Sequence, residues 1–411
     1  MKAVQDTVLF AAICIMFVFA IGGCSKDSGP AGGTISFWHF YSEPSQKQAL
    51  QQLVQDFEKV NNCKVNLTEL SWNDGKTKLL AAFNSQTAPD VVEFGSDWVA
   101  QFSAGGVLKE LDTKQMQMEK FLDWSLAPCR WDGKLYTVPW IVDTRVLYVN
   151  NSILEKAGVN TPPATMDDVM SIAEMTNEGD VNGFGVNGPD GHKLYKRVLP
   201  FFWSSGGSIL DSSNRCVIAS PANVAALTRY VELSRVGYIN TQKILDAQFA
   251  QGKLAMWYSG GWLAEKISKE NPLLDYSVVA LPDFGANKGV SFAGGEYLAI
   301  TKQSANADLA AKFIAYLTDG KNALALCRQI PTGGFPADKK YFNDNFFASH
   351  PIRSVFARQL ESARMTPIHP KWLEMELIIE NAAEEALYGR KTPEQALGDA
   401  QYLITKVLAT K

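Results

Sequence analysis

The fold is decided by the stretch LYVNNSILEKAGV at positions 147–159, which continues into PPATMDD at 162–168. Its first three residues are apolar and β-prone, so they predict a strand. Ser152 as an N-cap, with Glu155 three residues later, predicts a capping box and a short helix. Gly158 is expected to end that helix, because glycine readily adopts the left-handed conformation that follows a helix.

A second helix is expected directly after the two prolines. Thr165 is its predicted N-cap, and Asp167 and Asp168 lie in its first turn, where the helix dipole favours negative charge. This succession of strand, short helix and second helix resembles the central signature of the family 1 extracellular solute-binding proteins. These proteins are the sugar-capturing subunits of ABC importers, and maltose-binding protein is a distant relative. The resemblance implies that the segment enters a second lobe just after the chain first crosses a hinge.

Length and charge narrow the class of protein. A chain of 411 residues exceeds the usual limit of about 250–300 residues for one hydrophobic core, so at least two domains are expected. The formal net charge is −4, whereas nucleic-acid-binding proteins usually have an excess of basic residues, so a nucleic-acid partner is not expected.

The N-terminus indicates export. The segment 8–21 is almost wholly apolar but too short to span a bilayer comfortably, as in the apolar core of a signal peptide. The following Ile21-Gly22-Gly23-Cys24 resembles a bacterial lipobox, which implies cleavage before Cys24 and lipidation of that residue. The product would be anchored to the bacterial cell membrane, on its periplasmic or extracellular face. The alternatives are an uncleaved anchor or a plain signal peptide.

Cysteines and histidines give no sign of a metal site. Four cysteines remain in the exported part, Cys63, Cys129, Cys216 and Cys327, and the sequence does not choose a disulfide pairing among them. None has the close Cys/His spacing of a metal site, and the four histidines are scattered. We expect neither a metal nor a cofactor.

The N-terminal third alternates strands and helices. Strands are expected over 34–40, 64–70 and 90–94, and helices after Pro44, over 76–83 and from Asp97 to Phe102; Ser45 and Gln48 form a possible capping box for the first helix. This alternation predicts an α/β fold with a mostly parallel sheet covered on both faces. Ligands bind beyond the carboxyl ends of strands in such sheets, which selects the turns 38–43 and 95–98.

Further motifs follow in the order expected from the resemblance. The run 139–145 leads through the first interlobe crossing. The run FAQGKLAMWYSGGW at 249–262 delivers Trp262 at the end of a buried strand, and GGEYLAI at 294–300 matches the second crossing. Near the C-terminus Thr392, Pro393 and Gln395 predict the start of the last helix.

The resemblance implies a two-lobe periplasmic-binding-protein fold, with each lobe a mostly parallel sheet flanked by helices and the lobes joined by hinge crossings. The expected divisions are a signal peptide at 1–23, a flexible tether at 24–33, an N-terminal lobe at 34–142 plus 297–335, and a C-terminal lobe at 143–296 plus 336–411.

A sugar presents an apolar C–H face that packs on aromatic rings and a hydroxyl rim that needs polar partners, so its site mixes aromatic with acidic, amide or Arg side chains. The candidate ligand-binding residues are Trp38, Tyr41, Glu43, Asp97, Trp98, Arg145, Trp203, Tyr258, Trp262, Glu296, Tyr297 and Trp372. Structural roles are the alternatives: core packing for Trp38, Trp203 and Trp372, helix starts for Glu43 and Asp97, a hinge contact for Glu296, and pairing with Asp143 for Arg145.

The expected function is capture of a mono- or oligosaccharide by hinge closure and its delivery to an ABC permease, by a monomer that needs no catalytic residue. One alternative is an exported glycoside hydrolase in which Glu43 and Glu296 flank the bond. Another is a surface lipoprotein that binds a protein partner. A third is a binder of glycerol phosphates, with Arg145 or Arg328 as the cation, or of polyamines.

Overall fold

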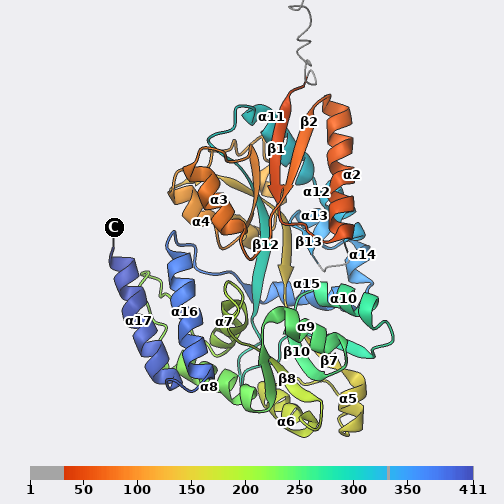
Figure 1. The fold of residues 1–411 in the computed structure, drawn as a ribbon, viewed down its shortest axis with the longest axis vertical. Helices are drawn as coiled ribbons and strands as arrows, with labels where there is room; N and C mark the ends of the chain where they lie inside the picture. Colours follow the sequence, from red (N-terminus) through yellow and green to blue (C-terminus); the bar gives the residue numbers. More distant parts are fainter. Residues whose placement is uncertain (1–31, 331–333, 411) are drawn as a thin grey trace, which may run out of the picture.

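The computed structural model describes residues 32–330 and 334–410. The predicted signal peptide, Cys24 and the tether up to residue 31 lie outside the described residues. Figure 1 shows two sheets, one above the other, each with helices around it. The predicted α/β fold is confirmed.

The first sheet has the strand order β13-β6-β12-β3-β1-β2, with β14 paired to β12. Its strands are β1 (Thr34–His39), β2 (Lys64–Glu69), β3 (Val91–Gly95), β6 (Thr137–Thr144), β12 (Ser291–Ile300), β13 (Phe335–Pro336) and β14 (Ala363–Arg364). Strand β1 pairs in parallel with β2 and β3, whereas β12 pairs antiparallel with β3 and β6.

The second sheet has the order β11-β7-β10-β8-β9. Its strands are β7 (Val146–Asn150), β8 (Asn182–Asn187), β9 (Gly237–Asn240), β10 (Leu254–Ser259) and β11 (Tyr276–Val279). Strand β8 is parallel to β9 and β10, and β7 is antiparallel to β10 and β11.

The antiparallel pairs have a topological cause. Strands β6 and β12 carry the chain between the two sheets, so β12 and β7 begin at the crossings and run away from them. The strands β1, β2, β3, β6 and β8–β11 run the opposite way, toward the region between the sheets. Their carboxyl ends therefore meet there, as the sequence predicted.

Helices cover both sheets (Figure 1). Around the first sheet lie α2 (Pro44–Asn61), α3 (Gly75–Asn84), α4 (Val99–Ala104), α11 (Ala307–Leu317), α12 (Gly320–Gln329), α13 (Lys339–Phe342) and α14 (Asn345–Ala348). Around the second lie α5 (Asn151–Lys156), α6 (Met166–Thr176), α7 (Tyr195–Ser204), α8 (Pro221–Arg235), α9 (Gln242–Ala250) and α10 (Trp262–Glu270).

The C-terminal region is helical, as predicted. Helix α15 (Pro351–Glu361) packs against strands of both sheets, and α16 (Trp372–Leu387) packs against α17 (Pro393–Ala409) and α8. Between β3 and β6 the chain forms the 3-10 helices η1 (Met118–Lys120) and η2 (Asp123–Cys129) and a small hairpin of β4 (Arg130–Trp131) and β5 (Lys134–Leu135).

Apolar side chains fill the space between each sheet and its helices. On the first sheet the ring of Phe37 meets that of Phe313 edge-on, with 5.5 Å between centroids. On the second, the ring of Tyr148 in the opening stretch stacks on that of Tyr276, at 5.9 Å. Cys63, Cys129, Cys216 and Cys327 are free thiols.

Two predicted helix caps are confirmed and two are wrong. The backbone N–H of Asp168 donates to Thr165 Oγ1, at 3.1 Å, and that of Gln395 donates to Thr392 Oγ1, at 3.2 Å. Helix α5, in contrast, starts before Ser152, because Asn150 Oδ1 accepts from the backbone N–H of Ile153 at 3.1 Å.

The second wrong cap is that of helix α2. Its N-cap is Glu43 rather than Ser45, since Pro44 occupies the first helical turn. The side chain of Gln46 accepts from the Glu43 N–H, at 3.1 Å, in place of the predicted contact of Gln48.

Candidate ligand-binding site

A cavity of about 310 Å³ lies where the carboxyl ends of the two sets of strands meet. Turns of the first sheet contribute Phe40, Tyr41, Glu43, Trp72, Glu93, Asp97 and Trp98. The crossings and the second sheet contribute Asp143, Arg145, His192, Lys193, Lys196, Gln242, Trp262, Phe292 and Gly294–Glu296. The cavity therefore draws side chains from both halves of the fold.

Three aromatic rings form one wall from the first sheet. The rings of Phe40 and Trp72 stack with their centroids 4.1 Å apart. Trp98 meets both of them edge-on, at 5.7 Å and 5.6 Å. These residues follow β1, β2 and β3, so the wall is built at the ends of three neighbouring strands.

Trp262 stands on the opposite side, at the start of α10, and its ring is held from two directions. Its Nε1 donates to Asp246 Oδ2 at 2.9 Å, and the guanidinium of Arg145 lies 5.3 Å from the ring centroid. Arg145 also bonds to Asp143 Oδ1, at 3.2 Å, and lies over Phe292. A half-buried aromatic face fixed in this way is suited to stack against a flat apolar ligand surface.

The carboxyl group of Asp246, in helix α9, holds the ring of Trp262 in place. Asp246 is buried, and its carboxyl group also accepts from Trp257 Nε1, at 2.7 Å, and Ser259 Oγ, at 2.8 Å. Burial raises the pKa of Asp246, while the three hydrogen bonds oppose that rise. The anchor therefore orients the Trp262 indole without facing the cavity itself.

Two carboxyl groups form the floor. Glu93 in β3 is 0% exposed, and its Oε2 accepts from the backbone N–H of Phe40 at 3.0 Å. Burial raises the pKa of Glu93 to about 8. Burial also raises the pKa of Glu296 in β12 well above its usual range, and the negative charges of Asp143 and Glu93 raise it further.

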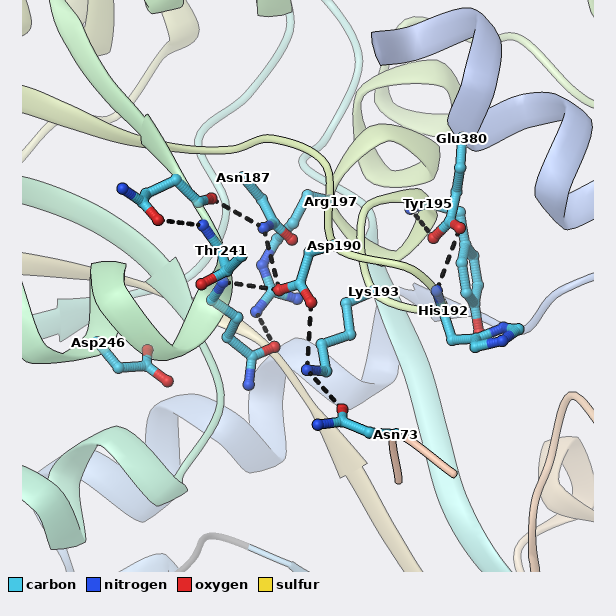
Figure 2. Close-up of polar contacts among 12 residues, drawn as sticks. Asn73, Asn187, Asp190, His192, Lys193, Tyr195, Arg197, Thr241, Asp246 and Glu380 are labelled. Atoms are coloured by element: carbon cyan, nitrogen blue, oxygen red, sulfur yellow. Dashed lines mark hydrogen bonds and ion pairs between the residues drawn. The ribbon is translucent and has the colours of Figure 1, made fainter. Parts of the chain in front are cut away.

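Polar contacts join the two halves beside the cavity. The hydroxyl of Tyr195 in α7 donates to Asp97 Oδ2, at 2.6 Å, and the ammonium of Lys193 bridges from Asp190 Oδ1, at 3.2 Å, to Asn73 Oδ1, at 3.3 Å. Figure 2 shows Lys193 reaching from Asp190 toward Asn73. These bonds tie the turns after β2 and β3 to the second half.

The loop that carries these contacts is fixed from α16. The backbone N–H groups of His192 and Tyr195 donate to Glu380, at 3.1 Å and 3.3 Å, as Figure 2 shows. The imidazole of His192 lies 2.5 Å from Glu376 Oε1, and this bond raises the pKa of His192. Burial raises the pKa of Glu380 to about 7.

Of the twelve predicted ligand-binding residues, the cavity lining contains seven: Tyr41, Glu43, Asp97, Trp98, Arg145, Trp262 and Glu296. Those that follow β1 and β3 come from the two turns selected by the strand-end rule. Asp97 is not an N-cap, since helix α4 begins after Trp98.

The lining does not contain the other five. Trp38 lies within β1 rather than beyond its end, and Trp203 lies in α7, which is buried on nearly every side. Tyr258 is buried against Ser291, with its hydroxyl 2.6 Å from Ser291 Oγ. None of these three side chains lines the cavity.

The remaining two are buried elsewhere. Tyr297 points to the face of β12 opposite Glu296, because successive side chains alternate along a strand, and its hydroxyl donates to the Ser125 carbonyl at 2.9 Å. Trp372 is 1% exposed and packs edge-on against Tyr195, with 5.6 Å between ring centroids.

Several lining residues were missed by the sequence reasoning. Trp72 follows β2, so the strand-end rule applied to that strand would have found it. Glu93 carried a second signal, because an acidic residue in a predicted buried strand is unusual. Lys193 and Lys196 lie in a loop and a helix that no motif marks.

The described residues contain neither a cluster suited to a metal ion nor a helix suited to span a membrane. Over 32–330 and 334–410, no group of three or more His, Cys, Asp or Glu side chains is placed to hold a metal ion. In the same ranges, no helix combines the length and apolar character that crossing a membrane requires.

Comparison with known proteins matches residues 42–323 to the family model of the bacterial extracellular solute-binding proteins. The diacetylchitobiose-binding protein DasA of Streptomyces coelicolor is 27% identical over 398 residues, which cover 90% of each chain. A galactooligosaccharide-binding protein of Bacillus subtilis is 24% identical over 94% of each chain.

Solved structures show the same fold. The acarbose-binding GacH receptor of Streptomyces glaucescens has a TM-score of 0.83 at 24% identity, covering 92% of this chain and 98% of its own. A Thermotoga lettingae solute-binding protein bound to α-D-tagatose has a TM-score of 0.83 at 23% identity, covering 92% of this chain and 100% of its own.

Proposed function

Because the chain belongs to the bacterial extracellular solute-binding protein family, we propose that it is the sugar-binding subunit of an ABC importer. Relatives that cover nine-tenths of the chain bind diacetylchitobiose and galactooligosaccharides, which supports a carbohydrate ligand. The observation that carries the proposal is the cavity itself, since its aromatic walls and its acidic floor match the two surfaces of a sugar.

The two lobes of the proposed mechanism are residues 34–142 plus 297–335 and residues 143–296 plus 336–411. The separate sheets β1–β3 and β7–β11 support two lobes, whereas β13, α13 and α14 lie with the first sheet and place the second boundary later in the chain than residue 336. A ligand that contacts Trp98 on one side and Trp262 on the other binds the closed arrangement better than the open one. It therefore shifts the population toward closure, and the closed form docks on the permease.

Binding without turnover is part of the proposal. Members of the family are binding proteins. A glycoside hydrolase needs two carboxyl groups flanking a bond, one of them ionised or exposed to water as a base. Glu43 and Glu296 both line the cavity, but the relatives DasA and the galactooligosaccharide-binding protein, which cover at least nine-tenths of the chain, are binding proteins. We therefore favour a binder over a hydrolase.

Export and anchoring complete the proposal. The chain is a monomer held at the bacterial membrane through a lipid on Cys24, which keeps it close to its permease. A labelled fatty acid should be incorporated into the full-length protein in cells and lost in Cys24→Ser. Incorporation that persists in the variant would contradict anchoring at this residue.

A thermal-shift screen tests the ligand class. The mature chain from residue 24, with Cys24→Ser to prevent lipid attachment, is melted with sugars, polyols, glycerol phosphates and polyamines. A ligand at 100 times its dissociation constant adds about 2.7 kcal/mol to the free energy of unfolding, which raises the melting temperature measurably. A rise with one class of sugar, without hydrolysis of that sugar, supports the proposal. Turnover of a glycoside would contradict it, and so would the lack of a rise with any sugar.

A further inference from the structure

The two floor carboxyl groups lie side by side on one face of the first sheet. In the antiparallel pair of β3 and β12, Glu93 is opposite Leu298 and Glu296 is opposite Gly95. Glu93 and Glu296 are therefore diagonal neighbours on the same face, a distance that long side chains can bridge. Gly95 has no side chain, and Asp97 Oδ1 and the ring of Trp72 occupy the space that a side chain there would take.

One oxygen of each carboxyl group is left without a partner. Glu93 Oε1 and Glu296 Oε2 are buried and make no hydrogen bond to any part of the chain that the structure describes. Both residues line the cavity. A buried oxygen without a donor is costly, so these two atoms mark a place where a ligand supplies donors.

The nearby cations are engaged elsewhere. Arg145 bonds to Asp143, at 3.2 Å, and Lys193 bonds to Asp190, also at 3.2 Å. Lys196 lies over the ring of Phe292, 5.6 Å from its centroid. Among the described residues, neither Glu93 nor Glu296 forms an ion pair, so the floor has a surplus of acidic groups.

We propose that the cavity takes an amino sugar with a free amino group, whose ammonium donates hydrogen bonds to Glu93 Oε1 and Glu296 Oε2. This inference rests on the sugar-binding function proposed above. The sugar ring would stack on Trp262, while the ammonium replaces the positive charge that the floor lacks. An ammonium supplies three donors and a charge, whereas a hydroxyl supplies one donor and no charge.

Binding of such a cation is coupled to proton release. Each floor carboxylic acid that ionises against the ammonium releases one proton to the solvent, and the ammonium keeps its own protons. The charged and titratable groups facing Glu296 are Glu93 from β3, Asp143 and Arg145 from the first crossing, Tyr41 from the turn after β1, and Cys327 from α12. Among these facing groups of the described chain, Glu93 and Glu296 alone are carboxyl groups with a buried oxygen that has no partner, so we assign the released protons to them.

The experiment compares matched sugars by isothermal titration calorimetry at pH 6.5. Glucosamine, galactosamine and the glucosamine dimer chitobiose are each titrated beside their hydroxyl and N-acetyl counterparts, into the mature chain in two buffers of different ionisation enthalpy. We expect the free amine to bind at least about 10-fold more tightly than its hydroxyl counterpart, because its hydrogen bonds are charge-assisted. The measured binding enthalpy should differ between the two buffers for the amines, which indicates proton release, and should not differ for their hydroxyl and N-acetyl counterparts.

Two variants assign the effect to the floor. In Glu93→Gln and in Glu296→Gln the preference for the amine should fall to within about 3-fold, because one carboxylate is lost. The control Glu110→Gln removes the same charge from an exposed ion pair with Lys134 and should keep the preference. Melting of each variant without ligand checks that it is folded.

The outcomes separate this inference from the function on which it rests. Equal or tighter binding of hydroxyl or N-acetyl sugars would overturn the inference and leave sugar binding intact, and so would an amine preference that survives in both floor variants. Binding of spermidine without binding of any sugar would overturn both, as would the absence of binding by every compound.

Discussion

At the scale of single residues, Trp262 owes its position to neighbours that are far from it in sequence. Its indole N–H is bound by Asp246, and Arg145 from the first crossing lies against its ring. Both contacts restrict the ring before any ligand arrives, which lowers the entropy lost on binding. A pre-ordered aromatic side chain of this kind is expected to contribute strongly to affinity.

Truncation of this ring tests that expectation. Trp262→Ala should weaken sugar binding by about 1–3 kcal/mol, or roughly 5- to 150-fold, through loss of the stacking surface. Calorimetric titration with the sugar found in the thermal-shift screen measures the change. The matched control is Trp131→Ala, since Trp131 lies in the small β4–β5 hairpin and does not line the cavity. Equal losses in the two variants would show that Trp262 has no special role.

Glu93 makes the stability of the free protein depend on pH. Its pKa is about 8 in the folded state and has the ordinary value of about 4.3 in the unfolded state. Between these values the folded chain binds more protons than the unfolded chain, so the free energy of unfolding falls as the pH rises. The stabilising contribution of protonated Glu93 is completely lost above about pH 8.

Glu93→Gln should therefore flatten this pH dependence. Without ligand, the variant should gain stability relative to the parent chain between pH 5 and 8, by at most about 1.4 kcal/mol per pH unit. Urea unfolding followed by circular dichroism at several pH values measures the slope. If the free energy of unfolding changes with pH by the same amount in Glu93→Gln and in the parent chain, Glu93 is not the group responsible for the pH dependence. Glu110→Gln, at an exposed ion pair, should leave the slope unchanged.

At the scale of elements, helix starts are where the sequence reasoning and the structure differ by one or two positions. In the opening stretch Asn150, Asn151 and Ser152 are all residues that commonly cap helices. The choice depends on where β7 ends, and β7 ends at Asn150 because its pairing with β11 ends there. The cap is thus set by the sheet rather than by local preference.

This difference gives a paired prediction. Asn150→Ala should lower the free energy of unfolding by about 0.5–2 kcal/mol, because the N–H of Ile153 loses its acceptor. Ser152→Ala should change it by less than about 0.5 kcal/mol. Urea denaturation of the two variants and the parent chain measures both values. A larger loss in Ser152→Ala than in Asn150→Ala would restore the cap predicted from the sequence.

At the scale of the whole molecule, contacts between the two halves set the balance between open and closed forms. The bond from Tyr195 to Asp97 is buried, and it joins α7 to the turn after β3. A hydrogen bond to a charged group is worth about 1.5–3 kcal/mol. If ligands bind by closure, this bond stabilises the arrangement that they select.

Tyr195→Phe should therefore favour the open form. We expect sugar affinity to fall by about 10-fold or more, and the radius of gyration of the ligand-free protein to rise in small-angle X-ray scattering. Tyr316→Phe is the control, since within the described chain the Tyr316 hydroxyl, on α11, makes no hydrogen bond. An unchanged affinity and radius in Tyr195→Phe would show that this contact does not govern closure.

The sequence by itself determined the kind of fold and the region of the site. Hydrophobic periodicity and turn residues depend on local geometry, so β1, β2, β3 and the helices between them were predicted to within a few residues. The rule that ligands lie beyond strand ends is also local. It placed Tyr41, Glu43, Asp97 and Trp98 in the cavity lining.

Only the tertiary structure decided which aromatic and acidic side chains meet. Trp203, Tyr258 and Trp372 are aromatic like Trp262, but they are buried and do not line the cavity. Glu93 and Glu296 are far apart in sequence, and the antiparallel register of β3 and β12 brings them together. Orientation and long-range pairing depend on how elements pack, and no local pattern in a single sequence encodes that packing.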